Sequence, residues 1–211
     1  MTVLGGCGAW PGAGQACSGY LVEDEGFRVL IDPGYATLPR LLALMGAADV
    51  DAVLVTHGHP DHCSDLNPLL RARALADDPA PPLPVHAPPG ALDAVMALDK
   101  PRMLAAALTI HDLRPGRPCE LGPSTELVSL AKDADLLLAE ATYPERVPEE
   151  DAPYLSSARD AGRTAASAGA ARLLLTHLWP DTPAEPALAA AAASYPGALS
   201  VATAGLTVDL A

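Results

Sequence analysis

One short segment limits what this chain can fold into more than any other. The run from Thr56 to His62 reads T-H-G-H-P-D-H, with three imidazoles and one carboxylate in the spacing H-x-H-x-D-H. It follows Val50 to Val55, an apolar run rich in β-branched residues that predicts a buried strand. It precedes Cys63 to Asp77, which predicts a helix. Open α/β sheets place their chemistry on loops at the carboxyl ends of strands. The sequence therefore predicts an α/β fold with a site on this loop.

The side chains on this loop suit a metal ion. Imidazole and carboxylate groups together bind zinc, iron or manganese. Gly58 and Pro60 place little side-chain bulk between the ligand candidates, so several of them can converge on one point. The candidates on the loop are His57, His59, Asp61 and His62.

Length, composition and cysteine use favour one cytoplasmic domain. The chain has 211 residues, of which half are hydrophobic, so we expect a single domain over residues 1–211. Its four cysteines form no C-x-x-C pair, which indicates reduced thiols in the cytoplasm rather than a disulfide framework. The sequence displays neither a secretory signal nor an apolar run long enough to span a bilayer.

Strands and helices alternate along the chain. A hairpin is predicted around Asp24, Glu25 and Gly26, because a short apolar run lies on each side of this turn. The predicted strands are 19–23, 27–32, 50–55, 85–87, 108–113, 135–139, 173–177, 199–203 and 206–210. The predicted helices are 37–45, 63–77, 90–98, 156–168 and 183–193.

The metal loop resembles that of the metallo-β-lactamase superfamily, and two further motifs match it. Leu173 to His177 is an apolar strand ending in His, similar to the family's last ligand, and Asp32 lies in a turn similar to its early Asp-x-Gly. The resemblance implies that His57 and His59 bind one metal, that Asp61, His62 and His177 bind a second, and that Asp32 steadies the His loop. It also implies one or two zinc ions, with manganese or iron as alternatives. The implied fold is a four-layer αββα sandwich.

Two motifs narrow the resemblance to one branch of the superfamily. The Gly-rich segments 3–11 and 16–22 resemble the opening of the ribonuclease Z and phosphodiesterase branch. Ala139 to Tyr143 resembles that branch's His-Glu-Ala-Thr-aromatic motif, so Glu140 is a candidate catalytic carboxylate or a supporting group. Ala139 stands where the tRNA-processing members carry a His that assists proton transfer, which weakens that particular activity.

The chain departs from the family between two predicted strands. The family supplies a further His and a bridging Asp there, whereas Arg114 to Lys132 contains neither residue type. We interpret this as an internal deletion that shortens one sheet, with a naturally short variant as the alternative. His86 and His111 are candidates to substitute, although both are more typical of core or surface histidines.

The expected function is that of a metal-dependent hydrolase acting on a phosphodiester through a metal-bound hydroxide, with Asp61 and Glu140 as catalytic residues. A non-catalytic binding module and a tRNA 3′-processing nuclease are the alternatives. The net charge of −13 disfavours large nucleic acids and membrane surfaces as partners. It leaves a small molecule or short phosphodiester as the expected substrate, and a homodimer remains open.

Overall fold

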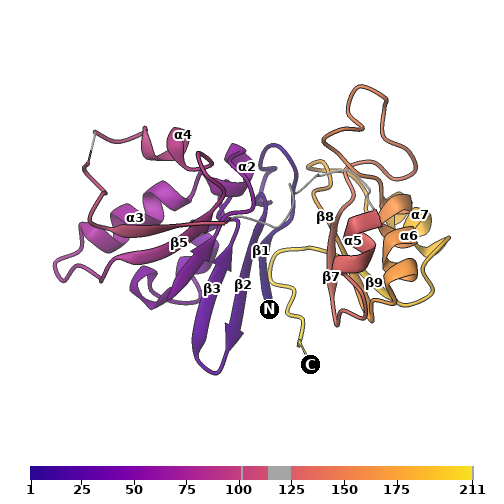
Figure 1. The fold of residues 1–211 in the computed structure, drawn as a ribbon, viewed down its shortest axis with the longest axis horizontal. Helices are drawn as coiled ribbons and strands as arrows, with labels where there is room; N and C mark the ends of the chain where they lie inside the picture. Colours follow the sequence, from indigo (N-terminus) through magenta and orange to yellow (C-terminus); the bar gives the residue numbers. More distant parts are fainter. Residues whose placement is uncertain (101, 114–124, 211) are drawn as a thin grey trace.

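The computed structural model describes residues 1–100, 102–113 and 125–210, in which two β-sheets pack between helices (Figure 1). The larger sheet has six strands in the order β1-β2-β3-β4-β5-β6, and the smaller has three in the order β7-β8-β9. The strands of the larger sheet are β1 (Thr2–Gly5), β2 (Gly19–Asp24), β3 (Phe27–Ile31), β4 (Ala52–Leu54), β5 (Leu83–Ala87) and β6 (Leu108–Asp112). Those of the smaller sheet are β7 (Leu137–Glu140), β8 (Arg172–Thr176) and β9 (Ala198–Val201).

The larger sheet begins antiparallel and continues parallel. Strands β2 and β3 form the predicted hairpin, and β3 to β6 run parallel to one another. Helices on one side of this sheet share its core, in which Leu66, Leu69 and Val53 are fully buried. These helices are α1 (Leu38–Leu42), α2 (Pro60–Cys63), α3 (Leu66–Ala74) and α4 (Asp93–Met96), with the 3₁₀ turn η1 (Ala47–Asp49).

The smaller sheet is entirely parallel and carries its own helices. These are α5 (Thr125–Leu130), α6 (Ala158–Ala168) and α7 (Glu185–Ala192). Helix α6 begins at Ser157, whose side chain accepts a hydrogen bond from the amide of Asp160, as expected of an N-cap. Alanine dominates the interface of α6 and α7 with the sheet, including Ala161, Ala165 and Ala190, so the helices lie close to the strands.

The two sheets meet through a third core cluster made of Val3, Tyr20, Leu174 and Ala202. The Tyr20 hydroxyl pairs there with the Thr176 hydroxyl, which links β2 to the end of β8. The layers therefore run helix, sheet, sheet, helix. The four-layer αββα arrangement predicted from the sequence is confirmed.

Two predicted elements are wrong in detail. The helix predicted over residues 63–77 is shorter, α3 at Leu66–Ala74, and a separate helix α2 ends at Cys63. The two are interrupted at Asp65, whose amide donates to the Pro33 carbonyl (2.8 Å) and whose carboxylate accepts from the Leu38 amide (2.7 Å). The strand predicted over 206–210 is a single bridge between Thr207 and Thr2, since the C-terminal segment runs beside β1 for only a short distance.

The predicted gap in the family pattern falls largely outside the described residues. On its near side, β6 pairs with β5 and exposes most of its side chains, including Ile110 at 53%. The described strand next to the gap is thus exposed and carries an exposed apolar side chain. The segment 114–124, which carries the missing ligands' positions, is not described. Within the described ranges, no helix is both long and apolar enough to cross a membrane.

Candidate metal centre

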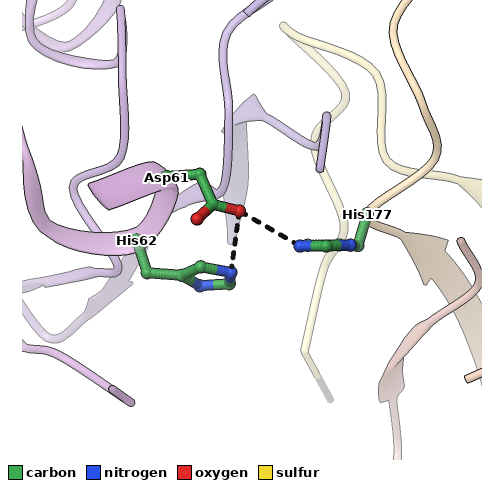
Figure 2. Close-up of side chains that lie close together, drawn as sticks. All are labelled: Asp61, His62 and His177. Carbon is green, nitrogen blue, oxygen red and sulfur yellow. Dashed lines mark hydrogen bonds and ion pairs between the residues drawn. The ribbon is translucent and has the colours of Figure 1, made fainter. Parts of the chain in front are cut away.

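The centre lies where two loops from different sheets meet. One loop follows β4 and leads into the short helix α2, which carries Asp61 and His62. The other follows β8 and carries His177, whose backbone adopts the left-handed region at φ 62°. Figure 2 shows the three side chains pointing toward one another from these two elements. Segments 116 residues apart in the sequence thus contribute to one cluster.

Asp61, His62 and His177 form a compact set of donor atoms. The Asp61 Oδ2 atom lies 3.1 Å from His177 Nε2 and 3.4 Å from His62 Nε2. One ligand atom from each residue lies within 4.8 Å of the other two. The sequence predicted that His177 approaches Asp61 and His62 closely enough to share an ion, and the structure has this geometry.

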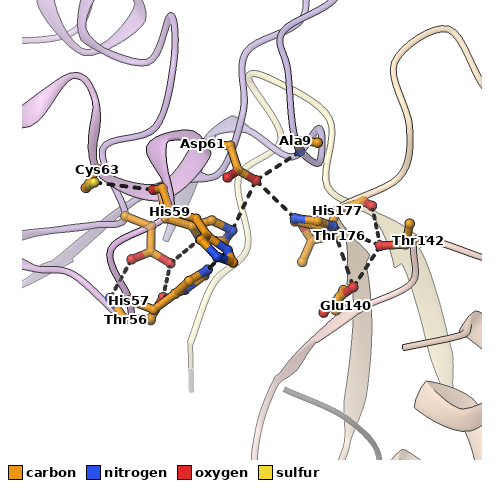
Figure 3. A network of polar contacts seen from close by, with 12 residues as sticks. Ala9, Thr56, His57, His59, Asp61, Cys63, Glu140, Thr142, Thr176 and His177 are labelled. Carbon is orange, nitrogen blue, oxygen red and sulfur yellow. Dashed lines mark hydrogen bonds and ion pairs between the residues drawn. The ribbon is translucent and has the colours of Figure 1, made fainter. Parts of the chain in front are cut away.

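His57 and His59 lie beside this set. The His57 Nε2 atom is 3.0 Å from His59 Nδ1, and the His57 ring is 4.1 Å from that of His62, measured between centroids. All five predicted ligands line one cavity, and Figure 3 shows His57, His59, Asp61 and His177 in this region. His57 and His59 form its more exposed end.

Asp32 holds the histidine loop as the resemblance implied. Its Oδ2 atom lies 2.9 Å from His62 Nδ1 and accepts a hydrogen bond from the Thr56 hydroxyl at 2.7 Å. Its Oδ1 atom accepts from the Thr56 amide at 2.7 Å. This contact orients the other ring nitrogen of His62 toward Asp61.

Charge is concentrated at the buried end of the cluster. Burial opposes protonation of His62, but hydrogen bonds with Asp32 and Asp61 outweigh it and raise the pKa of His62 to about 9. Burial alone would raise the pKa of Asp61, yet hydrogen bonds from His177, His62 and the Ala9 amide hold this pKa well below its usual range. Burial and the neighbouring histidines lower the pKa of His57 to about 4. At neutral pH Asp61 is therefore an anion, His57 is neutral and His62 is protonated, so a metal that binds His62 would displace its proton.

Thr142 and Glu140 lie on the Nδ1 side of His177, opposite the Nε2 atom that faces Asp61. The Thr142 hydroxyl lies 2.8 Å from His177 Nδ1 and donates to Glu140 Oε1 at 2.7 Å (Figure 3). Glu140 Oε1 also accepts from the Ser156 amide at 3.2 Å. Burial is the main cause that raises the pKa of Glu140, against the lowering effect of His177, Thr142 and Ser156.

The hydroxyl of Thr142 fixes the tautomer of His177. Because this hydroxyl has one proton and gives it to the Glu140 carboxylate, it accepts from the Nδ1–H group of His177. With a metal bound, the Nε2 atom of His177 would offer its lone pair on the side that faces Asp61 Oδ2, 3.1 Å away. Two acceptors that face each other in a buried position fit a shared cation, so the donor set suits a divalent metal.

The centre opens into a cavity of about 350 Å³. His57, His59, Asp61, His62, His177, Asp32 and Glu140 all line it. Leu138, Tyr154, Leu155 and Trp179 add an apolar and aromatic wall. His86 and His111 instead stack on each other, with ring centroids 4.8 Å apart, and neither is among the described lining residues. Nothing in their position supports a role as substitute ligands.

From the sequence, Thr142 was placed in a motif without a role, and neither the Ala9 amide nor the aromatic wall was identified. The Ala9 amide donates to Asp61 Oδ2 at 2.9 Å, which brings the Gly-rich N-terminal loop onto the centre. Gly8 permits this approach, because a Cβ atom there would lie 2.4 Å from His177 Nδ1. The Gly-rich segment indicated that a tight loop lies here, whereas no sequence pattern indicated that the Ala9 amide contacts Asp61.

Two sheets between helices, with a His and Asp cluster on the loops at their strand ends, define a metallo-β-lactamase fold. Residues 12–99 match the family described as the metallo-beta-lactamase superfamily. The "Probable metallo-hydrolase YhfI" of Bacillus subtilis (strain 168) is 29% identical over 84% of this chain and 86% of its own length. Its crystal structure has a TM-score of 0.84, with 24% identity over 97% of this chain and 96% of that chain. The chain therefore has the metallo-β-lactamase fold and, over residues 12–99, the sequence pattern of that superfamily.

Two further matches are named as a ribonuclease and a diphosphatase. A ribonuclease Z of Kineococcus radiotolerans is 32% identical over 70% of this chain but only 45% of its own length. The crystal structure of a new diphosphatase from the PhnP family has a TM-score of 0.68, at 18% identity over 99% of this chain and 97% of that chain. The superfamily implies divalent metal binding, and the cluster described here is a candidate for that site.

Proposed function

We propose that this protein is a metal-dependent hydrolase that cleaves a phosphodiester in a small or short substrate. One observation carries the proposal: Asp61, His62 and His177 converge from two sheets, with their ligand atoms within 4.8 Å of one another, at the floor of a cavity. The ribonuclease Z and PhnP-family relatives support the choice of phosphorus chemistry. The free thiols of Cys7, Cys17 and Cys63 support a reducing compartment such as the cytoplasm.

Asp61, His62 and His177 would hold one divalent metal, for which zinc is the first candidate and manganese or iron the alternatives. Three protein ligands with an open position are typical of catalytic zinc sites. When bound, such a metal supplies Lewis-acid polarisation of a phosphoryl oxygen and makes water more acidic. His57 and His59 would supply a second, weaker position, since only two imidazoles remain for it.

Two carboxylates of the chain would orient the attacking water and transfer protons. Asp61 would orient the attacking water as well as bind metal. Glu140 lines the same cavity, so its carboxylate is placed to take up or return a proton during hydrolysis. Asp32 and Thr142 would act through the histidines that they orient, without touching the substrate.

The test combines metal analysis with hydrolysis of bis(p-nitrophenyl) phosphate. Protein purified without chelator should contain about one tightly held metal per chain and should hydrolyse the ester. His177→Ala should remove most of the metal and the activity, because it deletes one of three ligands. His111→Ala is the matched control, since this exposed histidine lies outside the cavity lining. Tightly held metal without hydrolysis of any phosphodiester would instead favour the non-catalytic binding module.

A further inference from the structure

Aromatic side chains gather at the mouth of the metal cavity. The chain has only two tryptophans, five tyrosines and one phenylalanine. Trp10 stacks on Trp179, with ring centroids 5.0 Å apart and an interplanar angle of 25°. Tyr143 packs edge-on against Trp179 at 6.3 Å, and Tyr154 lines the cavity together with Trp179. Half of the chain's aromatic residues thus lie at this one position.

Much of this aromatic surface faces solvent. Tyr154 is 62% exposed and Trp10 is 52% exposed. Large aromatic rings that are exposed to solvent beside a cavity indicate a ligand-binding surface. The rings also come from segments that build the centre: Trp10 follows the Ala9 amide that contacts Asp61, and Trp179 lies two residues after His177. Any group bound at the metal therefore lies close to them.

The described lining of the cavity offers no basic side chain for a second phosphate. Among its described lining residues there is no lysine or arginine, whereas Asp32, Asp61 and Glu140 are acidic. Leu138 and Leu155 make the remainder of the wall apolar. A polyanionic strand would find no cations here beyond those at the metal centre. Affinity beyond the reacting phosphate must therefore come from stacking and apolar contact.

We propose that Trp10, Trp179 and Tyr154 form a stacking platform for a nucleobase, so that the substrate is a single nucleoside phosphodiester rather than a polynucleotide. The inference rests on the proposed hydrolase function for the placement of the phosphate. Every nucleobase has a flat face that stacks on an aromatic side chain, so the platform accepts bases with little selectivity among them. Tyr143 supports the platform and is not itself a part of it, because its hydroxyl donates to Asp151 (2.8 Å).

Binding of reaction products tests the platform independently of catalysis. Adenosine 5′-monophosphate and ribose 5-phosphate carry the same phosphate, and only the first carries a base. Calorimetric titration of the metal-loaded protein should show that the nucleotide binds about 5- to 150-fold more tightly, the range expected for stacking of one base. Tyr154→Ala and Trp10→Ala should reduce that ratio, whereas Tyr154→Phe should retain it. Tyr35→Ala is a control on a tyrosine outside the cavity lining.

Intrinsic fluorescence gives a second readout. Since both tryptophans of the chain lie in the platform, their emission reports on this surface alone. Adenosine 5′-monophosphate should quench it and ribose 5-phosphate should not. Equal affinity for the two compounds, with no selective quenching, would overturn the platform while the hydrolase proposal stands. Selective binding of the nucleotide by a protein that hydrolyses no phosphodiester would support the platform and overturn the hydrolase.

Discussion

Thr142 is the residue on which the orientation of His177 depends. Its single hydroxyl proton goes to Glu140, which leaves its oxygen to accept from His177 Nδ1 at 2.8 Å. The residues that hold a metal-binding histidine by its second nitrogen affect metal binding almost as strongly as the ligands. Thr142 therefore couples the carboxylate of Glu140 to the metal centre.

Replacing Thr142 tests this coupling. Thr142→Val keeps the shape of the side chain and removes the hydroxyl, so we expect metal affinity to fall about 10- to 100-fold. Thr142→Ser keeps the hydroxyl and should bind metal nearly as the unaltered protein does. Competition with a chromogenic chelator measures both. Equal affinities for the Val and Ser variants would show that the hydroxyl does not orient His177.

The pair of Asp32 and His62 predicts how the chelated protein responds to pH. His62 has an ordinary pKa of 6.5 and a folded pKa of about 9. Between these values the folded protein binds a proton that the unfolded chain does not, so the stabilisation is complete below pH 6.5 and is lost as pH rises through about 9. The free energy of unfolding should fall across this window in urea titrations. His62→Gln should flatten this dependence, and an unchanged slope would contradict the assignment.

The five predicted ligands were accessible to sequence reasoning because four of them follow one strand in fixed spacing and the fifth ends another apolar strand. Their grouping into one centre came from the resemblance to the metallo-β-lactamase superfamily, because β4 and β8 belong to different sheets and strand order alone does not bring their ends together. Thr142 and the Ala9 amide were not accessible in this way. Their contacts cross 35 and 52 residues of chain, and a hydroxyl or backbone amide has no periodicity that marks it.

At the scale of elements, apolar periodicity located nearly every strand and helix but did not give their exact ends. The break between α2 and α3 illustrates the reason. Residues 60–74 are compatible with one helix, and the interruption arises from bonds between Asp65 and the loop containing Pro33 and Leu38. Such contacts depend on how the elements are arranged in space. The same holds for the C-terminal segment, whose pairing with β1 depends on the packing of the two sheets.

The Gly-rich loop that leads from β1 to the metal centre gives a prediction at this scale. A Cβ atom at Gly8 would lie 2.4 Å from His177 Nδ1 and 2.8 Å from the His177 carbonyl oxygen. Gly8→Ala should therefore displace the loop or the histidine and lower metal affinity at least 10-fold, by analogy with loss of a supporting contact at about 10- to 100-fold. Gly46→Ala is the control, because its Cβ atom would approach only the Asp49 carboxylate, at 3.1 Å. Unchanged metal binding in Gly8→Ala would show that the loop is free to move away.

At the scale of the whole molecule, a bound metal would join the two sheets. Asp61 and His62 belong to the part of the chain built on the larger sheet, and His177 follows β8 of the smaller one. The core cluster of Val3, Tyr20, Leu174 and Ala202 also connects the sheets, together with backbone bonds such as that from the His177 amide to the Gly6 carbonyl (2.8 Å). A ligand that binds only the folded state stabilises it by about 3–4 kcal/mol at 100 to 1,000 times its dissociation constant. Chelation should lower the free energy of unfolding by about this amount.

Substitution of single histidines separates one metal position from two. His177→Ala should remove most of the metal-dependent stabilisation, because it deletes one of three ligands and the only one from the smaller sheet. His57→Ala should have a smaller effect, since it belongs to the position with two imidazoles. Thermal unfolding with and without chelator, together with metal content, measures both variants. Two tightly bound metals per chain, with both substitutions equally damaging, would contradict the single-metal arrangement. Residues other than His57 and His59 would then have to complete the second metal position.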